Sequence, residues 1–167
     1  MELKELTEKA VELFGVNSPH DLGKALLSAC SDTDKLDSFC KLVDGDLSVD
    51  WLQKIYQYYL ADRDQKKQDY TPSSIAQFIG LLAGKSDHII DLCAGSGALI
   101  IQKWAINHDV KVTAIEYDEA VIPFLLFNLV IRNIQADVFH KDALTDDEPI
   151  NTWIITKGET YGNLIDI

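Results

Sequence analysis

Basic side chains are scarce in this chain of 167 residues, because Lys and Arg number 15 against 27 Asp and Glu, a formal net charge of −12. Nonspecific affinity for nucleic acid comes from clustered Lys and Arg. The composition therefore argues against unaided binding of a phosphate backbone, and any role on nucleic acid requires a basic partner.

Cysteines and long apolar runs are also scarce. The three cysteines, Cys30, Cys40 and Cys93, have neither C-x-x-C nor Cys/His ligand spacing, which argues against a disulfide framework and a structural zinc site. No apolar run reaches the roughly 18 residues of a membrane span, and the charge-mixed, amphipathic beginning differs from a signal peptide. We expect a soluble, cytoplasmic protein with reduced thiols and no membrane partner.

The two parts of the chain differ in pattern, and we place a boundary between residues 69 and 70. Residues 1–69 carry apolar side chains at helical spacing and predict a small helical N-terminal domain. The expected helices cover residues 3–14, 20–30, 31–43 with Ser31 as a cap, and a stretch from Ser48 or Val49 into 62–69. The aromatic-rich run 51–60 fits core packing better than base stacking, because its side chains share one helix face.

Residues 70–167 alternate between strand and helix patterns. We predict helices over 72–84, 98–108 and 119–133, a short strand starting at His88, and strands over 110–118, 136–140 and 152–156. Such alternation predicts an α/β fold with a parallel sheet and right-handed crossovers.

The strongest local signal is the glycine turn 91–97, Asp-Leu-Cys-Ala-Gly-Ser-Gly, between an apolar strand and a helix. Open α/β sheets bind ligands at the carboxyl ends of their strands, where glycines allow close approach. Ile100 stands where a dinucleotide fingerprint has a third glycine, and Asp91 would repel a pyrophosphate, so NAD is disfavoured. Glu116, at the end of the next strand, is placed to bind two ribose hydroxyls. The pattern indicates a nucleoside with a positively charged tail.

The segments "DYTPSSIAQFI", "DLCAGSGAL", "AIEYDE" and "HKDAL" resemble the successive motifs of adenine-specific DNA methyltransferases, particularly the modification subunits of type I restriction-modification systems. The resemblance covers about residues 68–156 and includes a helical domain ahead of the Tyr-Thr-Pro element. It implies a class I methyltransferase (Rossmann-like), doubly wound sheet and S-adenosyl-L-methionine as the cofactor. The family reaction is methyl transfer to the adenine amino group of DNA.

The resemblance also implies roles for individual residues. The methionine moiety would be bordered by Tyr70, Thr71 and Pro72. The methionine and sulfonium end would be surrounded by Asp91, Ala94, Gly95, Ser96 and Gly97. The ribose would be bound by Glu116, the adenine ring would lie against Tyr117, and its polar edge would contact Asp142 and Ala143. Three alternatives stay open: Asp142 as a solvated loop acid, Tyr117 packed under the sheet, and Thr71 with Pro72 as a mere helix start.

The sequence departs from the family after the fourth predicted strand. The family has an Asn-Pro-Pro-aromatic catalytic motif there that holds a flipped base, whereas this chain continues as Lys-Gly-Glu-Thr-Tyr over 157–161. Tyr161 alone could still stack on a base. We therefore name no catalytic residue and no metal ligand, and we expect a chain that binds cofactor but is weakly active or inactive.

The sheet predicted for 70–167 has fewer strands than the family's catalytic domains, so it is expected to be incomplete and apparently truncated. An uncovered fourth-strand edge would invite pairing into a homo- or hetero-oligomer, and DNA would be bound only with a partner subunit or the missing region. Two other functions stay open. One is a non-catalytic interaction module that binds a partner subunit, and the other is a small-molecule or protein methyltransferase.

Overall fold

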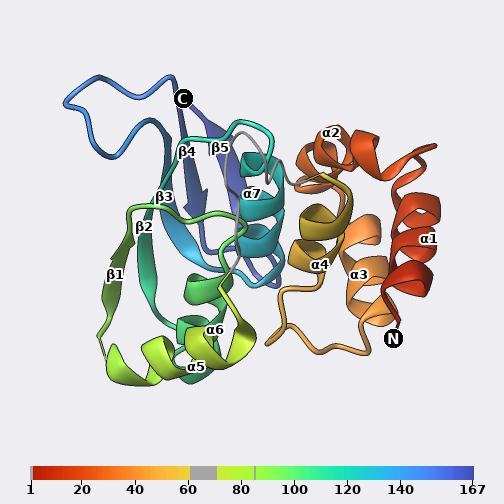
Figure 1. Ribbon diagram of the computed structural model, residues 1–167, viewed down its shortest axis with the longest axis horizontal. Coiled ribbons are helices and arrows are strands. Elements are labelled where there is room, and N and C mark those ends of the chain that lie inside the picture. Colours follow the sequence, from red (N-terminus) through yellow and green to blue (C-terminus); the bar gives the residue numbers. More distant parts are fainter. Residues whose placement is uncertain (1, 61–70, 85) are drawn as a thin grey trace.

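The computed structural model describes residues 2–60, 71–84 and 86–167 (Figure 1). The predicted boundary between residues 69 and 70 and the charged run with Arg63, Lys66 and Lys67 lie outside the described residues. The division into 1–69 and 70–167 therefore stays a prediction. In the described part of the chain, no helix has both the length and the apolar character that crossing a membrane requires.

The first part of the chain is helical, as predicted. Its helices are α1 (Leu3–Phe14), the 3-10 helix η1 (Pro19–Asp21), α2 (Leu22–Ala29), α3 (Thr33–Leu42) and α4 (Trp51–Tyr59). Two helix starts differ from the prediction. Asp32 rather than Ser31 caps α3 by accepting a hydrogen bond from Lys35 N (3.2 Å), and Asp50 caps α4 by accepting one from Gln53 N (2.9 Å). A carboxylate oxygen satisfies an N–H of the first turn that has no partner within the helix.

The second part alternates strands and helices and confirms the predicted α/β class. Its first elements are α5 (Ser73–Leu82), β1 (His88–Asp91), α6 (Ala98–Ile106), β2 (Lys111–Glu116), α7 (Ile122–Ile131) and β3 (Gln135–His140). The three strands are parallel and lie in the order β1-β2-β3, with His88 beside Lys111 and Lys111 beside Gln135. This β–α–β–α–β unit is the predicted partial Rossmann-like arrangement.

The last two strands correct the expectation of an all-parallel sheet. β4 (Asn151–Thr156) runs antiparallel to β3, and β5 (Asn163–Asp166), which was not predicted, runs antiparallel to β4. A parallel return needs a long crossover, usually with a helix, whereas the loop 141–150 contains none. The fourth-strand edge that was expected to be open is paired on both sides, so the edges of this sheet are β1 and β5.

Helix α7 lies between the sheet and the first helices (Figure 1). The Phe127 ring of α7 meets Phe14 at 5.5 Å and Phe39 at 5.2 Å between centroids. The Tyr56 ring of α4 meets Phe124 at 5.0 Å, and Tyr56 is buried. The interpretation of α4 as a core-packing helix is therefore confirmed, and one hydrophobic core joins both parts of the chain.

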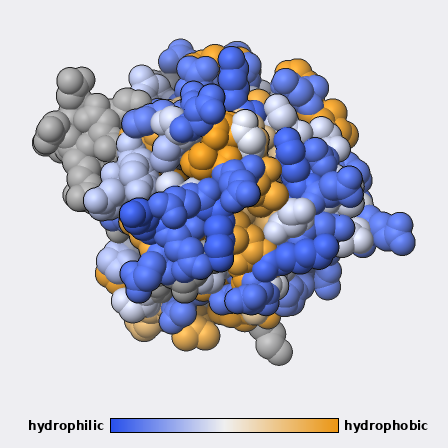
Figure 2. Space-filling model, turned by 90° about the vertical axis from the view of Figure 1, so that its right-hand side faces the viewer, coloured by the Kyte–Doolittle hydropathy of each residue, from blue (hydrophilic) through white to orange (hydrophobic). Residues whose placement is uncertain are grey.

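Helices cover one face of the sheet. The side chains of Val112 and Ala114 on β2 and of Ala136 and Val138 on β3 are buried, while the alternate positions are half-buried or exposed. Because the three strands follow one another across the sheet, right-handed crossovers place α6 and α7 on the same face. The outer face of the helical part is largely hydrophilic, with a central strip of hydrophobic residues (Figure 2).

Candidate functional site

Three acidic residues follow the carboxyl ends of the three parallel strands. Asp91 is the last residue of β1, Glu116 is the last residue of β2, and Asp142 comes just after β3. The strand register places Asp91 beside Ala114 and Glu116 beside His140, so these ends meet along one edge of the sheet. This edge is where open α/β sheets bind ligands.

The glycine turn between β1 and α6 has a backbone that only glycine adopts readily. Gly95 has a φ of 55° and Gly97, directly before α6, has a φ of 94°. Both angles lie in the left-handed region, where a Cβ atom is strained. The Ala94 N–H donates to the carbonyl of Ile115 (3.0 Å), which fastens the turn to β2.

The Glu116 carboxylate is held by two backbone N–H groups. Gly95 N donates to its Oε2 and Asp118 N to its Oε1, each at 2.7 Å. A carboxylate offers about four lone-pair sites, so two acceptor sites stay available on these oriented oxygens. The arrangement is suited to a pair of neighbouring hydroxyl groups.

The site is negatively charged. Burial, together with the neighbouring Glu116 carboxylate, raises the pKa of Asp91, and a hydrogen bond from Cys93 N opposes the increase. The pKa of the Cys93 thiol is also raised by burial and then by Glu116, Asp91 and Asp142. Three carboxylates therefore act on the same space, where a positively charged ligand group is favoured.

A cavity of about 250 Å³ lies against the glycine turn. Its described lining residues are Gln53, Thr71, Cys93, Ala94, Gly95, Ser96, Ala98, Leu99, Glu116 and Val121. They include no Lys or Arg. Gln53, from the first turn of α4, was not predicted, because no local motif marks it and the folded chain brings it to the turn.

Other predicted site residues lie around this cavity. Pro72 directly precedes α5 and lines a neighbouring cavity of about 350 Å³, so the interpretation of this element as a helix start also holds. Tyr70 lies outside the described residues. Asp91, Gly97, Asp142 and Ala143 belong to the same strand ends and turn without lining the cavity.

The side chains of Tyr117 and Ser96 point in different directions from the turn and the strand end. Tyr117 is 68% exposed, so the alternative that it packs under the sheet is wrong. Ser96 is 1% exposed and its hydroxyl donates to Asp50 Oδ2 (2.7 Å), away from a ligand. Asp142 is half-buried and accepts a hydrogen bond from Leu144 N (2.9 Å), as a loop acid does.

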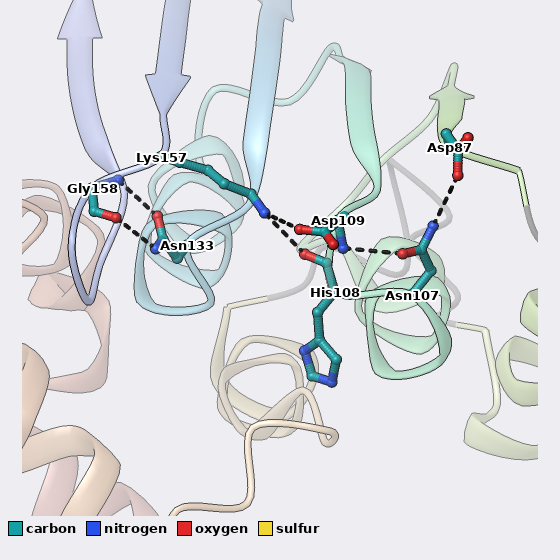
Figure 3. Close-up of polar contacts among 7 residues, drawn as sticks. All are labelled: Asp87, Asn107, His108, Asp109, Asn133, Lys157 and Gly158. Atoms are coloured by element: carbon teal, nitrogen blue, oxygen red, sulfur yellow. Dashed lines mark hydrogen bonds and ion pairs between the residues drawn. The ribbon is translucent and has the colours of Figure 1, made fainter.

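The segment 157–161, where the resemblance implied a catalytic motif, lies at the end of the sheet where β2 and β3 begin (Figure 3). Lys157 Nζ donates to Asp109 Oδ1 (2.6 Å), just before β2, and Gly158 N donates to Asn133 Oδ1 (2.9 Å), just before β3. Tyr161 donates from its hydroxyl to Asp37 Oδ1 (2.6 Å) on α3. Tyr161, which the sequence left as a residue that could stack on a base, lies away from the glycine turn, because β4 runs antiparallel and carries this segment to the other end of the sheet.

Comparison with known proteins gives a match to a family model and a match to a solved structure. A model of the N-6 DNA methylase family matches residues 47–157. The solved structures include a protein of Listeria monocytogenes assigned to the class I S-adenosylmethionine-dependent methyltransferases, with 15% identity and a TM-score of 0.48. The match covers 87% of this chain and 53% of the other, so the chain spans about half the length of that protein. No curated protein matches the chain.

Proposed function

The chain belongs to the N-6 DNA methylase family, and on that premise we propose that it binds S-adenosyl-L-methionine at the carboxyl ends of β1, β2 and β3. The observation that carries the proposal is the Glu116 carboxylate, held by Gly95 N and Asp118 N at 2.7 Å beside the glycine turn. Each of these two oriented carboxylate oxygens keeps a lone pair that can accept a hydrogen bond from one hydroxyl group of a diol.

The residues present suit several parts of this cofactor. Its ammonium and sulfonium cations match the negative space beside Asp91 and the glycine turn, where no Lys or Arg is among the described lining residues. Glu116 would accept hydrogen bonds from the ribose hydroxyls. The exposed ring of Tyr117 would lie against the adenine, with Asp142 and Ala143 at its polar edge. Thr71 would border the methionine part, since it lines the same cavity.

The family reaction supports a finer proposal, in which the cofactor supplies an electrophilic methyl group to the amino nitrogen of an adenine in DNA. This chain would be slow or inactive alone, because Lys157 to Tyr161 lie at the amino ends of the strands and are held there by Asp109, Asn133 and Asp37. Its net charge of −12 also disfavours DNA, so a basic partner would have to hold the duplex.

Calorimetry separates the binding proposal from the chemical one. Titration of the protein with S-adenosyl-L-methionine and with its demethylated product is expected to give saturable heat for both. A flat titration at millimolar ligand would contradict the binding proposal. A radiolabelled methyl-transfer assay on duplex DNA is expected to show little incorporation, and clear turnover by the isolated chain would overturn the proposed inactivity.

A second candidate is a non-catalytic module that binds cofactor and a partner subunit. The position of Lys157 and Gly158 at the far end of the sheet favours it, because the described residues bring no base-holding segment to the cavity. Sedimentation with and without cofactor distinguishes the candidates. A stable oligomer without methyl transfer would favour the module, while a monomer that methylates DNA would exclude it.

The affinity for S-adenosyl-L-methionine is expected to fall as the pH falls through the raised pKa of Asp91. Burial and Glu116 raise this pKa above its usual value of 3.8. The ionised carboxylate attracts the cation and the protonated one does not, so full affinity is present above the raised pKa and is lost below it. Calorimetric titrations from about pH 7 to about pH 4.5 measure the loss.

Asp91→Asn is the matched control for this pH dependence. Its affinity is expected to be weak and nearly constant over the same range. The stability of the ligand-free protein changes with pH in the opposite direction to the affinity. A pKa that is raised in the folded state gives stability that is present at acid pH and lost as the pH rises. Asp91→Asn is therefore expected to raise the melting temperature near neutral pH. A wild-type affinity that grows on acidification contradicts the account.

A further inference from the structure

A buried polar network joins the start of α4 to the glycine turn. Asp50 Oδ2 accepts a hydrogen bond from the Ser96 hydroxyl (2.7 Å), and Asp50 Oδ1 accepts one from Asn128 Nδ2 (3.0 Å) and one from Gln53 N (2.9 Å). Asn128 Nδ2 also donates to the Ser96 carbonyl oxygen (2.9 Å). Asp50, Ser96 and Asn128 are all buried.

The network holds the turn at a second residue, Ser96, next to the one that Glu116 holds. Glu116 fixes the turn on the cavity side through Gly95 N, while Asp50 and Asn128 fix the next residue, Ser96, through its hydroxyl and its carbonyl oxygen. The backbone of the turn is therefore held at two successive residues before any ligand arrives. Binding to a preset backbone avoids the entropy of ordering it.

We infer that Asp50 is a positioning residue for the cofactor turn and acts through the Ser96 hydroxyl, an inference that rests on the proposed function. Asp50 does not line the 250 Å³ cavity, and it lines the neighbouring cavity of about 350 Å³ together with Pro72. Its carboxylate oxygens accept hydrogen bonds from Ser96, Asn128 and Gln53, so it acts on the turn through these groups. It connects the helical part of the chain to the turn across forty-six positions of sequence, from 50 to 96.

Helix capping alone does not account for this carboxylate. Asp32 caps α3 with the same geometry, accepting from Lys35 N at 3.2 Å, at a position where its side chain is 41% exposed. Asp50 is buried, and a buried carboxylate is unfavourable unless several donors reach it. Ser or Asn would cap α4 without that penalty, and only a side chain with two well-placed acceptor atoms also binds Ser96 and Asn128.

The test uses four variants of the full chain and one matched control. Asp50→Ser keeps an N-cap oxygen but is too short for Ser96, and Ser96→Ala removes the other partner with a change too small to unfold the protein. The remaining two are the double variant and Asp50→Asn, which retains an acceptor for Gln53 N and a polar atom facing Ser96. Asp32→Ser is the control, because it makes the same replacement at the cap of α3.

Two readouts are needed for each variant. The first is the dissociation constant for S-adenosyl-L-methionine, measured by calorimetry. The second is amide hydrogen exchange at Gly95 and Gly97 in the ligand-free protein, compared with Val112 and Val138 in the sheet. If Asp50 is only a helix cap, its replacement changes amide exchange in the turn and the sheet alike or in neither. If Asp50 positions the turn, its replacement changes amide exchange at Gly95 and Gly97 alone.

Asp50→Ser and Ser96→Ala are each expected to weaken binding about tenfold, and the double variant no more than about tenfold, because both remove one interaction. Exchange at Gly95 and Gly97 is expected to rise in these variants and stay unchanged in the sheet. Asp50→Asn is expected to bind within about threefold of the wild type, and Asp32→Ser to bind equally well.

Either of two results overturns the inference: wild-type affinity in Asp50→Ser and Ser96→Ala, or exchange at the turn that does not change. An additive loss of about a hundredfold in the double variant would also overturn it. If the wild type binds no cofactor, the proposed function fails, and the exchange measurement alone then supports or overturns the role of Asp50.

Discussion

Replacement of Glu116 by glutamine is expected to weaken the binding of S-adenosyl-L-methionine about a hundredfold. The carboxylate accepts from Gly95 N and Asp118 N, and Glu116 lines the cavity. An amide has one acceptor oxygen, so its NH₂ group would face one of these N–H donors, and the ribose would lose charged hydrogen bonds. Calorimetry on the variant measures the loss.

Glu119→Gln is the matched control for this substitution. Glu119 is exposed, lies three residues further along the chain, and does not line the cavity beside Gly95. It removes the same charge from the chain, so it is expected to change the affinity less than about twofold after screening by salt. Equal losses in the two variants would mean that general charge, and not the diol geometry, governs binding.

Replacement of Arg132 by methionine is expected to lower the free energy of unfolding by about 3–5 kcal/mol. Arg132 is 4% exposed, and burial lowers its pKa to about 10, so it stays charged at neutral pH. It donates to the carbonyls of Leu47 (2.7 Å) and Val49 (3.0 Å) and to Asn128 Oδ1 (2.9 Å). Its removal leaves these acceptors without their donor and the Asp50 charge without its nearby cation.

Denaturant unfolding of the ligand-free protein measures this change. The matched control is Lys111→Met at the exposed beginning of β2, which is expected to change the free energy of unfolding by less than about 0.5 kcal/mol. A loss below about 1 kcal/mol for Arg132→Met would contradict the view that this side chain fastens the residues before α4 to the end of α7.

The sequence predicts the glycine turn and the strand ends beside it well, because their signals are local. Glycines at 95 and 97, followed directly by a helix, specify the left-handed turn, and Glu116 ends a strand whose alternation is plain. Parallel pairing then brings the ends of β1, β2 and β3 together without further information. The acidic character of the site follows from the same residues.

The predicted direction of β4 was wrong, because the sheet was expected to be parallel throughout, and this is the largest correction. The pattern of 152–156 is that of any half-buried strand, and neither its partner nor its direction is encoded in alternation. The loop 141–150, without a helical pattern, was the available signal for an antiparallel return. Because β4 turns back, Lys157, Gly158 and Tyr161 lie away from the glycine turn.

The polar network was not predicted either, since its members are far apart in sequence. Asp50 was expected in the first turn of a helix and Ser96 against the cofactor, whereas the structure joins their side chains in the core. The signal was the placement of one acid at a helix start and one hydroxyl in the turn. Neither feature of the sequence predicts that Asp50 contacts Ser96, because that contact forms only when α4 packs against α7.

Nuclear magnetic resonance of the labelled full chain during titration with S-adenosyl-L-methionine tests most directly where the cofactor binds. We predict saturable shifts of the amide signals of Gly95, Gly97 and Tyr117, with the signals of Gly158 and Asn163 unchanged. Those two groups lie at opposite ends of the sheet. No shifts at millimolar cofactor, or shifts centred on Gly158 and Asn163, would contradict a cofactor site at the carboxyl ends of β1, β2 and β3.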